Sequence, residues 1–112
     1  MLTFITKYNL LDPPSASDNV LVQSTTYNSA TIQWTEPSDN GGSAITGYSI
    51  TISPSTSTCS SCNVSNDTLM YNITELNHTV SYTISVAAIN CAGTGDSVFL
   101  PIYIIPRGKF VW

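Results

Sequence analysis

Apolar and polar residues alternate along several short stretches of the chain. The stretches Ala30 to Trp34, Tyr48 to Ile52 and Tyr82 to Ala88 each place apolar side chains at every second position, and Val20 to Val22 forms a shorter apolar run. Successive side chains of a β-strand point to opposite faces, so this period gives each strand one buried and one hydrated face. Helical spacing of apolar residues is nearly absent. The pattern therefore predicts an all-β domain.

Clusters of turn-forming residues separate these stretches. They lie at residues 36–42, 53–55, 75–78 and 91–96. Short strands that alternate with turns about every ten residues are typical of a β-sandwich or a small barrel. A last strand is expected from Val98 to Ile105, with Pro101 in its middle. Because proline cannot donate a hydrogen bond to a neighbouring strand, this strand should lie at a sheet edge.

Charge is scarce and unevenly placed in the 112 residues, a length that suits one compact domain. Charged residues make up 9% of the chain, against about 25% in a typical soluble domain, so the surface should be rich in hydroxyl groups. The basic residues are Lys7, Arg107 and Lys109, which leaves residues 13–105 with six acidic and no basic side chains. Such a chain is a poor partner for nucleic acid or for an anionic membrane.

Targeting and membrane-spanning segments are not evident. No apolar stretch approaches the roughly 20 residues that a transmembrane helix needs. Polar residues interrupt Met1 to Leu11, which therefore lacks the apolar centre of a signal peptide. We expect the chain to be a piece of a longer protein.

Five motifs, in order, resemble those of the fibronectin type III domain between about Pro13 and Ile105. The first three are Asp12-Pro13-Pro14, Trp34-Thr35-Glu36-Pro37 and Gly41-Gly42-Ser43-Ala44-Ile45-Thr46-Gly47-Tyr48. The fourth is Leu76 six residues before Tyr82, and the fifth is Tyr82-x-Ile84-x-Val86-x-Ala88-x-Asn90-x-x-Gly93.

This resemblance implies an all-β, immunoglobulin-like sandwich of seven antiparallel strands, in sheets A-B-E and C′-C-F-G. The domain would cover residues 13–105, between an N-terminal extension (1–12) and a C-terminal tail (106–112). The residues expected in its core are Trp34, Tyr48, Leu76 and Tyr82.

The resemblance leaves three details of the fold to be determined: the hydrogen bond of Tyr82, the A–B register and the length of strand C′. The buried phenol of Tyr82 should find a backbone acceptor in the turn after Leu76, as in a tyrosine corner. Extra residues between Pro14 and Trp34 leave the A–B register open. Strand C′ could be short or displaced, because residues 56–68 are rich in Cys, Ser and Asn.

Catalytic chemistry finds little support in the sequence. His78 is the single histidine, and it lies in the predicted E–F turn, where a solvated side chain is expected. Gly93-Thr94-Gly95 lacks the third glycine of a nucleotide-binding loop and predicts a hairpin turn. We therefore predict no catalytic, cofactor-binding or metal-binding residue, and no small-molecule substrate.

The closely spaced Cys59 and Cys62 could form a disulfide, a redox pair or half of a zinc site. No helix is predicted that would activate a redox thiol, and zinc would need His78 and Cys91 as further ligands. In the family's topology Cys91 ends strand F, far from Cys59. We predict a Cys59–Cys62 disulfide, with two reduced thiols as the alternative. Cys91 would be a free, partly exposed thiol or form an intermolecular bridge.

Four Asn-x-Ser/Thr sequons fall between residues 63 and 79. This region corresponds to the C′–E edge of the sandwich, where glycans would block pairing with other chains. The predicted glycosylation sites are Asn63, Asn66, Asn72 and Asn77.

The B–C and F–G turns share one end of the sandwich in this family, and we expect that end to be free of glycan and to contact partners. The candidate contact residues are Asp39, Asn40, Gly41, Gly42, Gly93, Thr94, Gly95 and Asp96. Asp96-Ser97 matches the end of the integrin-binding Arg-Gly-Asp-Ser motif of some family members, but Thr94 replaces the arginine. An integrin site is therefore not predicted.

Our leading hypothesis is a non-enzymatic module of a larger extracellular or cell-surface protein. It would act as a spacer and a protein-contact surface in adhesion or receptor function. The alternatives are an intracellular module of a giant muscle-type protein and an accessory domain beside a carbohydrate-active enzyme.

Overall fold

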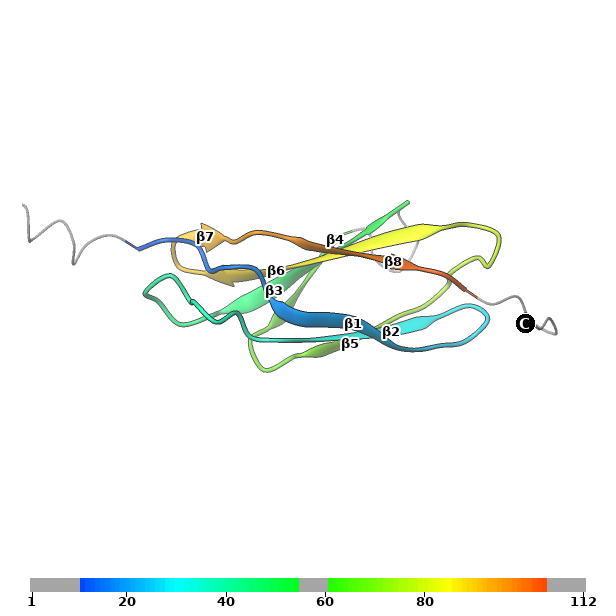
Figure 1. Ribbon diagram of the computed structural model, residues 1–112, viewed down its shortest axis with the longest axis horizontal. Coiled ribbons are helices and arrows are strands. Elements are labelled where there is room, and N and C mark those ends of the chain that lie inside the picture. The colour runs from blue at the N-terminus through cyan, green and yellow to red at the C-terminus, as the bar shows by residue number, and fades with distance from the viewer. Residues whose placement is uncertain (1–10, 55–60, 105–112) are drawn as a thin grey trace, which may run out of the picture.

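The computed structural model describes residues 11–54 and 61–104, which form a sandwich of two antiparallel sheets (Figure 1). The smaller sheet has the order β1 (Asp18–Thr25), β2 (Ala30–Thr35) and β5 (Met70–Ile73). The larger sheet contains β4 (Ser61–Ser65), β3 (Gly47–Ser53), β6 (Tyr82–Asn90), β7 (Gly93–Thr94) and β8 (Val98–Ile102). These sheets correspond to A-B-E and C′-C-F-G, so the predicted fold class is confirmed.

The described residues form eight strands where seven are expected, because strand G is divided. β7 pairs with the end of β6 at Ile89 and Asn90, whereas β8 pairs with residues 82–86 of β6. The residues 95–97 between them belong to neither strand. Among the described strands β8 pairs with β6 alone, so the expected edge position of Pro101 is confirmed.

The hydrogen-bonding pattern explains why β8 accommodates Pro101. The Gly95 N–H donates to the Ala88 carbonyl at 2.8 Å, so the backbone groups of even-numbered β6 residues face the strand G side. Leu100 lies opposite Ile84 and Pro101 opposite Thr83. The alternation of an antiparallel ladder then directs the Pro101 nitrogen to the free edge, where no donor is needed.

The core lies between the sheets and consists of the inward faces that the alternation predicted. Trp34 is 2% exposed and Tyr48 0% exposed. The other buried apolar residues of this cluster are Ala30, Ile32, Ile45, Ile50, Ile52, Ile73, Leu76, Tyr82, Ile84, Val86, Ala88, Ile102 and Ile104. Tyr71 of β5 is partly buried and packs against this cluster.

β1 absorbs the extra residues that precede Trp34. Its pairing with β2 shifts register between Asp18 and Leu21 and again between Val22 and Ser24. Asn19, inside the first irregularity, has a positive φ of 51°, a conformation that asparagine tolerates better than most residues. These two bulges settle the A–B register that the sequence left open.

The tyrosine corner is present, but its hydrogen bond runs opposite to the expected direction. The backbone N–H of Asn77 donates to the Tyr82 hydroxyl oxygen at 2.9 Å. The phenol thus accepts a bond from the turn after Leu76, where we had expected it to donate to a carbonyl. The bond satisfies a backbone donor of the E–F turn.

No helix within residues 11–54 and 61–104 is long and apolar enough to cross a membrane. The described chain starts at the β7 end of the sandwich and ends at the opposite end (Figure 1).

Candidate functional site

Three segments meet at the β7 end of the sandwich. We call them the leading segment (residues 11–15), the B–C loop (36–46) and the F–G turn (91–97). In Figure 1 the leading segment runs beside β7 before it continues into β1. This end holds the eight residues that the sequence predicted for partner contact.

The leading segment is hydrogen-bonded to the B–C loop through backbone and side-chain groups. The N–H of Asp12 donates to the Gly41 carbonyl at 3.0 Å, and the N–H of Ser15 donates to the Asp39 carbonyl at 2.9 Å. In return, the Asp39 N–H donates to the Ser15 hydroxyl at 3.3 Å. Residues 12–15 therefore pair with residues 39–41 almost as a short extra strand would.

Two glycines let the leading segment come this close. A Cβ atom at Gly41 would lie 1.9 Å from the Asp12 carbonyl oxygen, and one at Gly95 would lie 2.0 Å from the Pro14 carbonyl oxygen. Both distances are far below van der Waals contact, so only glycine fits unless the segment moves. The leading segment thus lies between the B–C loop and the F–G turn.

Asn90, the last residue of β6, connects all three segments through its side-chain amide. Its Nδ2 donates to the carbonyls of Asp12 and Asn40, each at 2.7 Å. Its Oδ1 accepts from the N–H groups of Ala92 and Gly93 at 2.8 and 3.2 Å. The side chain is 4% exposed, so these four bonds replace water for nearly all of its polar capacity.

Two consecutive side-chain bonds shape the tip of the B–C loop. The Gly41 N–H donates to Oδ1 of Asp39 at 2.8 Å, and the Gly42 N–H donates to Oδ1 of Asn40 at 2.9 Å. Gly42 has a φ of 97°, which most residues with a side chain avoid. The Asp39 and Asn40 side chains are therefore held by their own loop but stay exposed.

The predicted contact residues divide into two groups. Gly41, Gly93 and Gly95 are half-buried beside the leading segment. The others present exposed surface: they are Asp39, Asn40, Gly42, Thr94 and Asp96. Leu11 is also exposed, at 44%, which adds an apolar side chain to this end that the sequence reasoning did not include.

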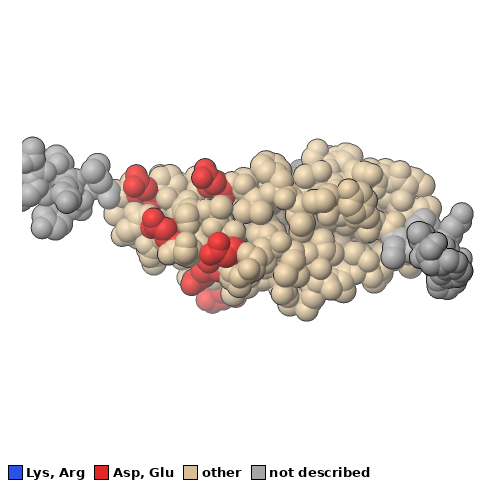
Figure 2. Space-filling model, in the orientation of Figure 1, with Lys and Arg blue, Asp and Glu red and all other residues tan. Residues whose placement is uncertain are grey.

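Negative charge gathers at the same end of the sandwich. Asp12, Asp39 and Asp96 come from the leading segment, the B–C loop and the F–G turn respectively. Figure 2 shows acidic side chains over this end and neither acidic nor basic side chains over the rest of the described surface on that face. The described residues contain no Lys or Arg, so within residues 11–54 and 61–104 no basic side chain offsets this charge.

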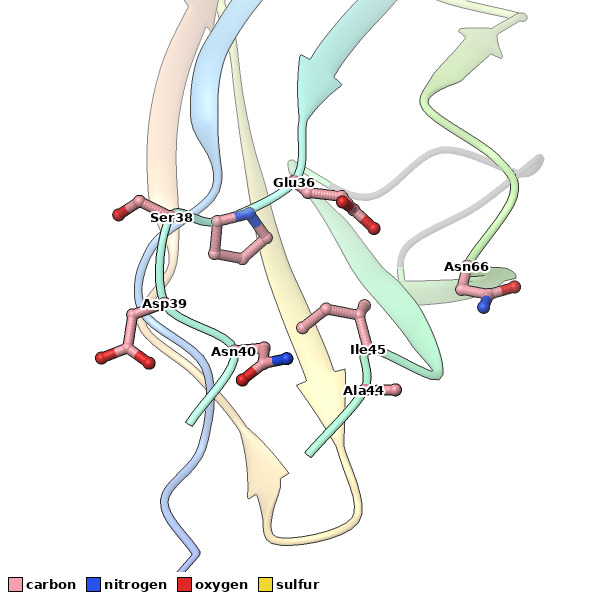
Figure 3. A pocket seen from close by; sticks show the side chains of 8 residues that line it. Glu36, Ser38, Asp39, Asn40, Ala44, Ile45 and Asn66 are labelled. Carbon is pink, nitrogen blue, oxygen red and sulfur yellow. The ribbon is translucent and has the colours of Figure 1, made fainter. Parts of the chain in front are cut away.

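A pocket of about 390 Å³ opens beside the B–C loop. Its lining residues are Glu36, Pro37, Ser38, Asp39, Asn40, Ala44, Ile45 and Asn66. In Figure 3 Asn66 lies on the opposite side of the pocket from Asp39. Asn66 belongs to the turn between β4 and β5, and this turn returns to the B–C end because β4 runs antiparallel to β3. One of the four predicted glycosylation sites, Asn66, therefore lies beside the B–C loop, at the end where no glycan is expected.

The sequon asparagines are all exposed in the structure. Asn63 lies in β4 and Asn72 in β5, the two strands that form one side of the sandwich. Oδ1 of Asn72 accepts a hydrogen bond from the Thr31 hydroxyl at 3.1 Å. Oδ1 of Asn77 accepts from both the N–H and the hydroxyl of Thr79, at 2.9 and 2.7 Å.

The cysteines lie in different environments. Cys59 is outside the described residues, so its pairing with Cys62 stays a prediction. Cys62 is half-buried in β4, where the Tyr71 hydroxyl donates to its Sγ at 3.6 Å. Cys91 is a free, exposed thiol in the F–G turn that donates to the Ser43 hydroxyl at 3.1 Å.

The remaining residues that could carry chemistry do not form a cluster in the described structure. His78 is exposed in the E–F turn. Within the part of the chain that the structure describes, no group of three or more His, Cys, Asp and Glu side chains is placed to hold a metal ion.

The core beneath this end contains polar atoms without partners. The Tyr48 hydroxyl and the Trp34 Nε1 are buried and make no hydrogen bond with the described residues. Burial, with a smaller contribution from the negative charge of Glu36, raises the pKa of Tyr48 above its ordinary value of 10.0. Both effects oppose a charged phenolate in the core.

Comparisons with known proteins agree with this architecture. The family model of the fibronectin type III domain matches residues 12–101. Titin of Drosophila melanogaster is 37% identical over 87 residues, which cover 76% of this chain and 0% of titin to the nearest percent. The solved domains A168–A170 of titin are 26% identical with a TM-score of 0.67, over 84% of this chain and 33% of that fragment.

The FN1–FN3 domains of chicken contactin share the fold, with a TM-score of 0.65 and 21% identity over 80% of this chain and 31% of theirs. The chain thus spans a third or less of these relatives. Because the family match includes most of the chain and the two sheets have the family's strand order, the chain belongs to the fibronectin type III family.

Proposed function

We propose that this chain is a non-enzymatic module of a larger extracellular or cell-surface protein, where it acts as a spacer and a protein-contact surface in adhesion or receptor function. The carrying observation is that the B–C loop and the F–G turn lie at one end with exposed Asp39, Asn40, Thr94 and Asp96. Loops held on a rigid sandwich are where binding residues of such folds are usually found.

The path of the chain supports the spacer role. The leading segment and the end of β8 lie at opposite ends of the sandwich (Figure 1), so neighbouring parts of a longer chain would be held apart by its length. Partners are proteins or neighbouring domains of the same chain. The negative charge of the loop end disfavours nucleic acid.

The proposed location rests on surface chemistry. The four sequon asparagines are exposed, which is what glycosylation in the secretory pathway would require. The predicted Cys59–Cys62 disulfide also fits an oxidising compartment.

Site-specific photo-crosslinking tests the contact surface. A photoreactive amino acid would replace Asp39 at the loop end or, as the matched control, Ser81 in the E–F turn at the other end; both side chains are exposed. The full chain would be added to the protein's own cells before illumination. We expect one discrete protein adduct from position 39 and none from position 81. Equal amounts of adduct from both positions, or no adduct from position 39, would contradict the contact surface and leave the spacer role as the proposed function.

A second candidate is an intracellular structural module of a giant muscle-type protein. The observation that favours it is the 37% identity to titin. The state of the sequons in the native protein separates the two locations, because enzymes of the secretory pathway attach N-linked glycans and the cytosol lacks them.

A further inference from the structure

We infer that Asn90 is a positioning residue that locks the leading segment, the B–C loop and the F–G turn into one clasp, so that order in one of the three is coupled to order in the others. The clasp would make the leading segment part of the module's contact end. This structural coupling does not depend on the module's location, whereas its use in partner binding rests on the proposed function.

The first support is that the Asn90 amide has no hydrogen-bonding capacity left over. Both N–H groups of Nδ2 are used, one by the leading segment at Asp12 and one by the B–C loop at Asn40. Its Oδ1 is shared by two N–H groups of the F–G turn. A side chain of another type at this position would leave backbone groups of at least one segment without their Asn90 partner.

The second support is that Asn90 ties the loops to a rigid element. Asn90 ends the longest strand of the larger sheet and pairs with Gly93. By contrast, the bonds of Asp12 and Ser15 to the B–C loop join one connecting segment to another. The amide of Asn90 therefore fixes the leading segment to the sheet. It also adds to the bonds by which Thr46, at the end of the B–C loop, is already held to the Ile89 carbonyl.

The third support is steric. Gly95 of the F–G turn and Gly41 of the B–C loop each press against a carbonyl of the leading segment, with no room for a Cβ. The segment cannot shift towards either loop without collision. A movement of either loop towards the segment must therefore displace it, and by linkage a partner that orders the loops also orders the segment.

Asn90→Asp tests the clasp with the least change of shape. The aspartate keeps an oxygen for the N–H groups of Ala92 and Gly93 but presents an acceptor to the carbonyls of Asp12 and Asn40. In the full chain, without any partner, amide hydrogen exchange followed by NMR should speed up about tenfold at Asp12 and Ser15, as expected for the loss of a stabilising hydrogen bond. Ala92 and Gly93 keep their acceptor oxygen, so their exchange should speed up by less, and only through the coupling of the F–G turn to the leading segment.

Asn40→Asp is the charge-matched control, because it adds the same charge at the same end while keeping the Oδ1 acceptor for Gly42. It should leave exchange at Asp12 and Ser15 within about twofold of wild type. Unchanged exchange at these two amides in Asn90→Asp would overturn the inference. A uniform acceleration across β6 would also overturn it, since Asn90 would then support the whole sandwich.

Gly95→Ala keeps the inference testable if Asn90→Asp does not fold. Its Cβ would displace the Pro14 carbonyl without removing a hydrogen-bonding side chain. The expected result is faster exchange at Asp12 and Ser15 together with the F–G turn, and unchanged exchange in the β1–β2 pairs. Faster exchange confined to the F–G turn would contradict coupling. Because no partner is present, either result leaves the proposed partner contact to its own test.

Discussion

The indole of Trp34 meets the ring of Tyr48 edge to face, with the ring centroids 5.5 Å apart and the planes inclined by 61°. Trp34 belongs to the smaller sheet and Tyr48 to the larger one, so this contact joins the two layers within the core. Aromatic pairs of this geometry contribute beyond the area they bury. The pair also lies next to the B–C loop in sequence, and it therefore supports the candidate contact end.

Trp34→Ala should lower the free energy of unfolding by about 3 to 5 kcal/mol, because it removes the ring contact and leaves a cavity between the sheets. Trp34→Phe should cost less, since it keeps an aromatic ring on the site. Chemical denaturation measures both. A Trp34→Ala value within about 1 kcal/mol of wild type would show that the indole does not hold the sheets together.

Tyr82→Phe should cost about 1 to 3 kcal/mol, because it leaves the Asn77 N–H without its acceptor at the tyrosine corner. Tyr71→Phe is the matched control: within the described residues its hydroxyl donates to the Cys62 sulfur at 3.6 Å, a weak acceptor, so the loss should be smaller. Denaturation curves of the two variants decide the order. An equal or smaller loss for Tyr82→Phe would mean that the corner contributes nothing to stability.

Tyr48→Phe should be neutral or stabilising, because the hydroxyl it removes is buried without a partner among the described residues. The raised pKa of Tyr48 has a further consequence at high pH. Above pH 10.0 the phenol of the unfolded chain loses its proton while the folded phenol keeps it, so wild-type stability should fall as pH rises. The difference between wild type and Tyr48→Phe isolates this effect. Parallel stability curves for the two proteins up to pH 11 would contradict the shift.

The predicted Cys59–Cys62 disulfide should contribute at or below the low end of about 2–4 kcal/mol, because it closes a very short loop. Thiol titration of the denatured, unreduced protein from a secretory host should find one free group, that of Cys91. Reduction should add two more and lower the unfolding midpoint slightly. Three free thiols before reduction would show that the Cys59–Cys62 disulfide does not form.

The period of two along the strands was enough to predict the sheets and most of the core, because burial of alternate side chains fixes which face points inward. It did not predict the bulges in β1 or the division of strand G. Both depend on where a strand departs from its hydrogen-bonding register. The apolar pattern shows which face is buried but not which backbone groups pair. β7 illustrates the point, since its residues Gly93 and Thr94 pair with β6 inside a stretch that the sequence predicts as a turn.

The candidate site was predicted only in part. The turn residues identified the B–C and F–G loops, and the family's topology placed them together. The position of the leading segment between them was missed, because it depends on long-range bonds from Asn90 to Asp12 and Asn40. The one sequence feature that could have indicated it is the presence of glycines at Gly41 and Gly95, where another backbone approaches closely.

Mass spectrometry of the native protein tests the central claim most directly. The proposed extracellular contact module predicts N-linked glycan on at least one of Asn63, Asn72 and Asn77, and an unmodified or only partly modified Asn66 if the pocket beside the B–C loop receives a partner. Four unmodified sequons, together with three free thiols, would contradict the extracellular assignment and favour the intracellular module.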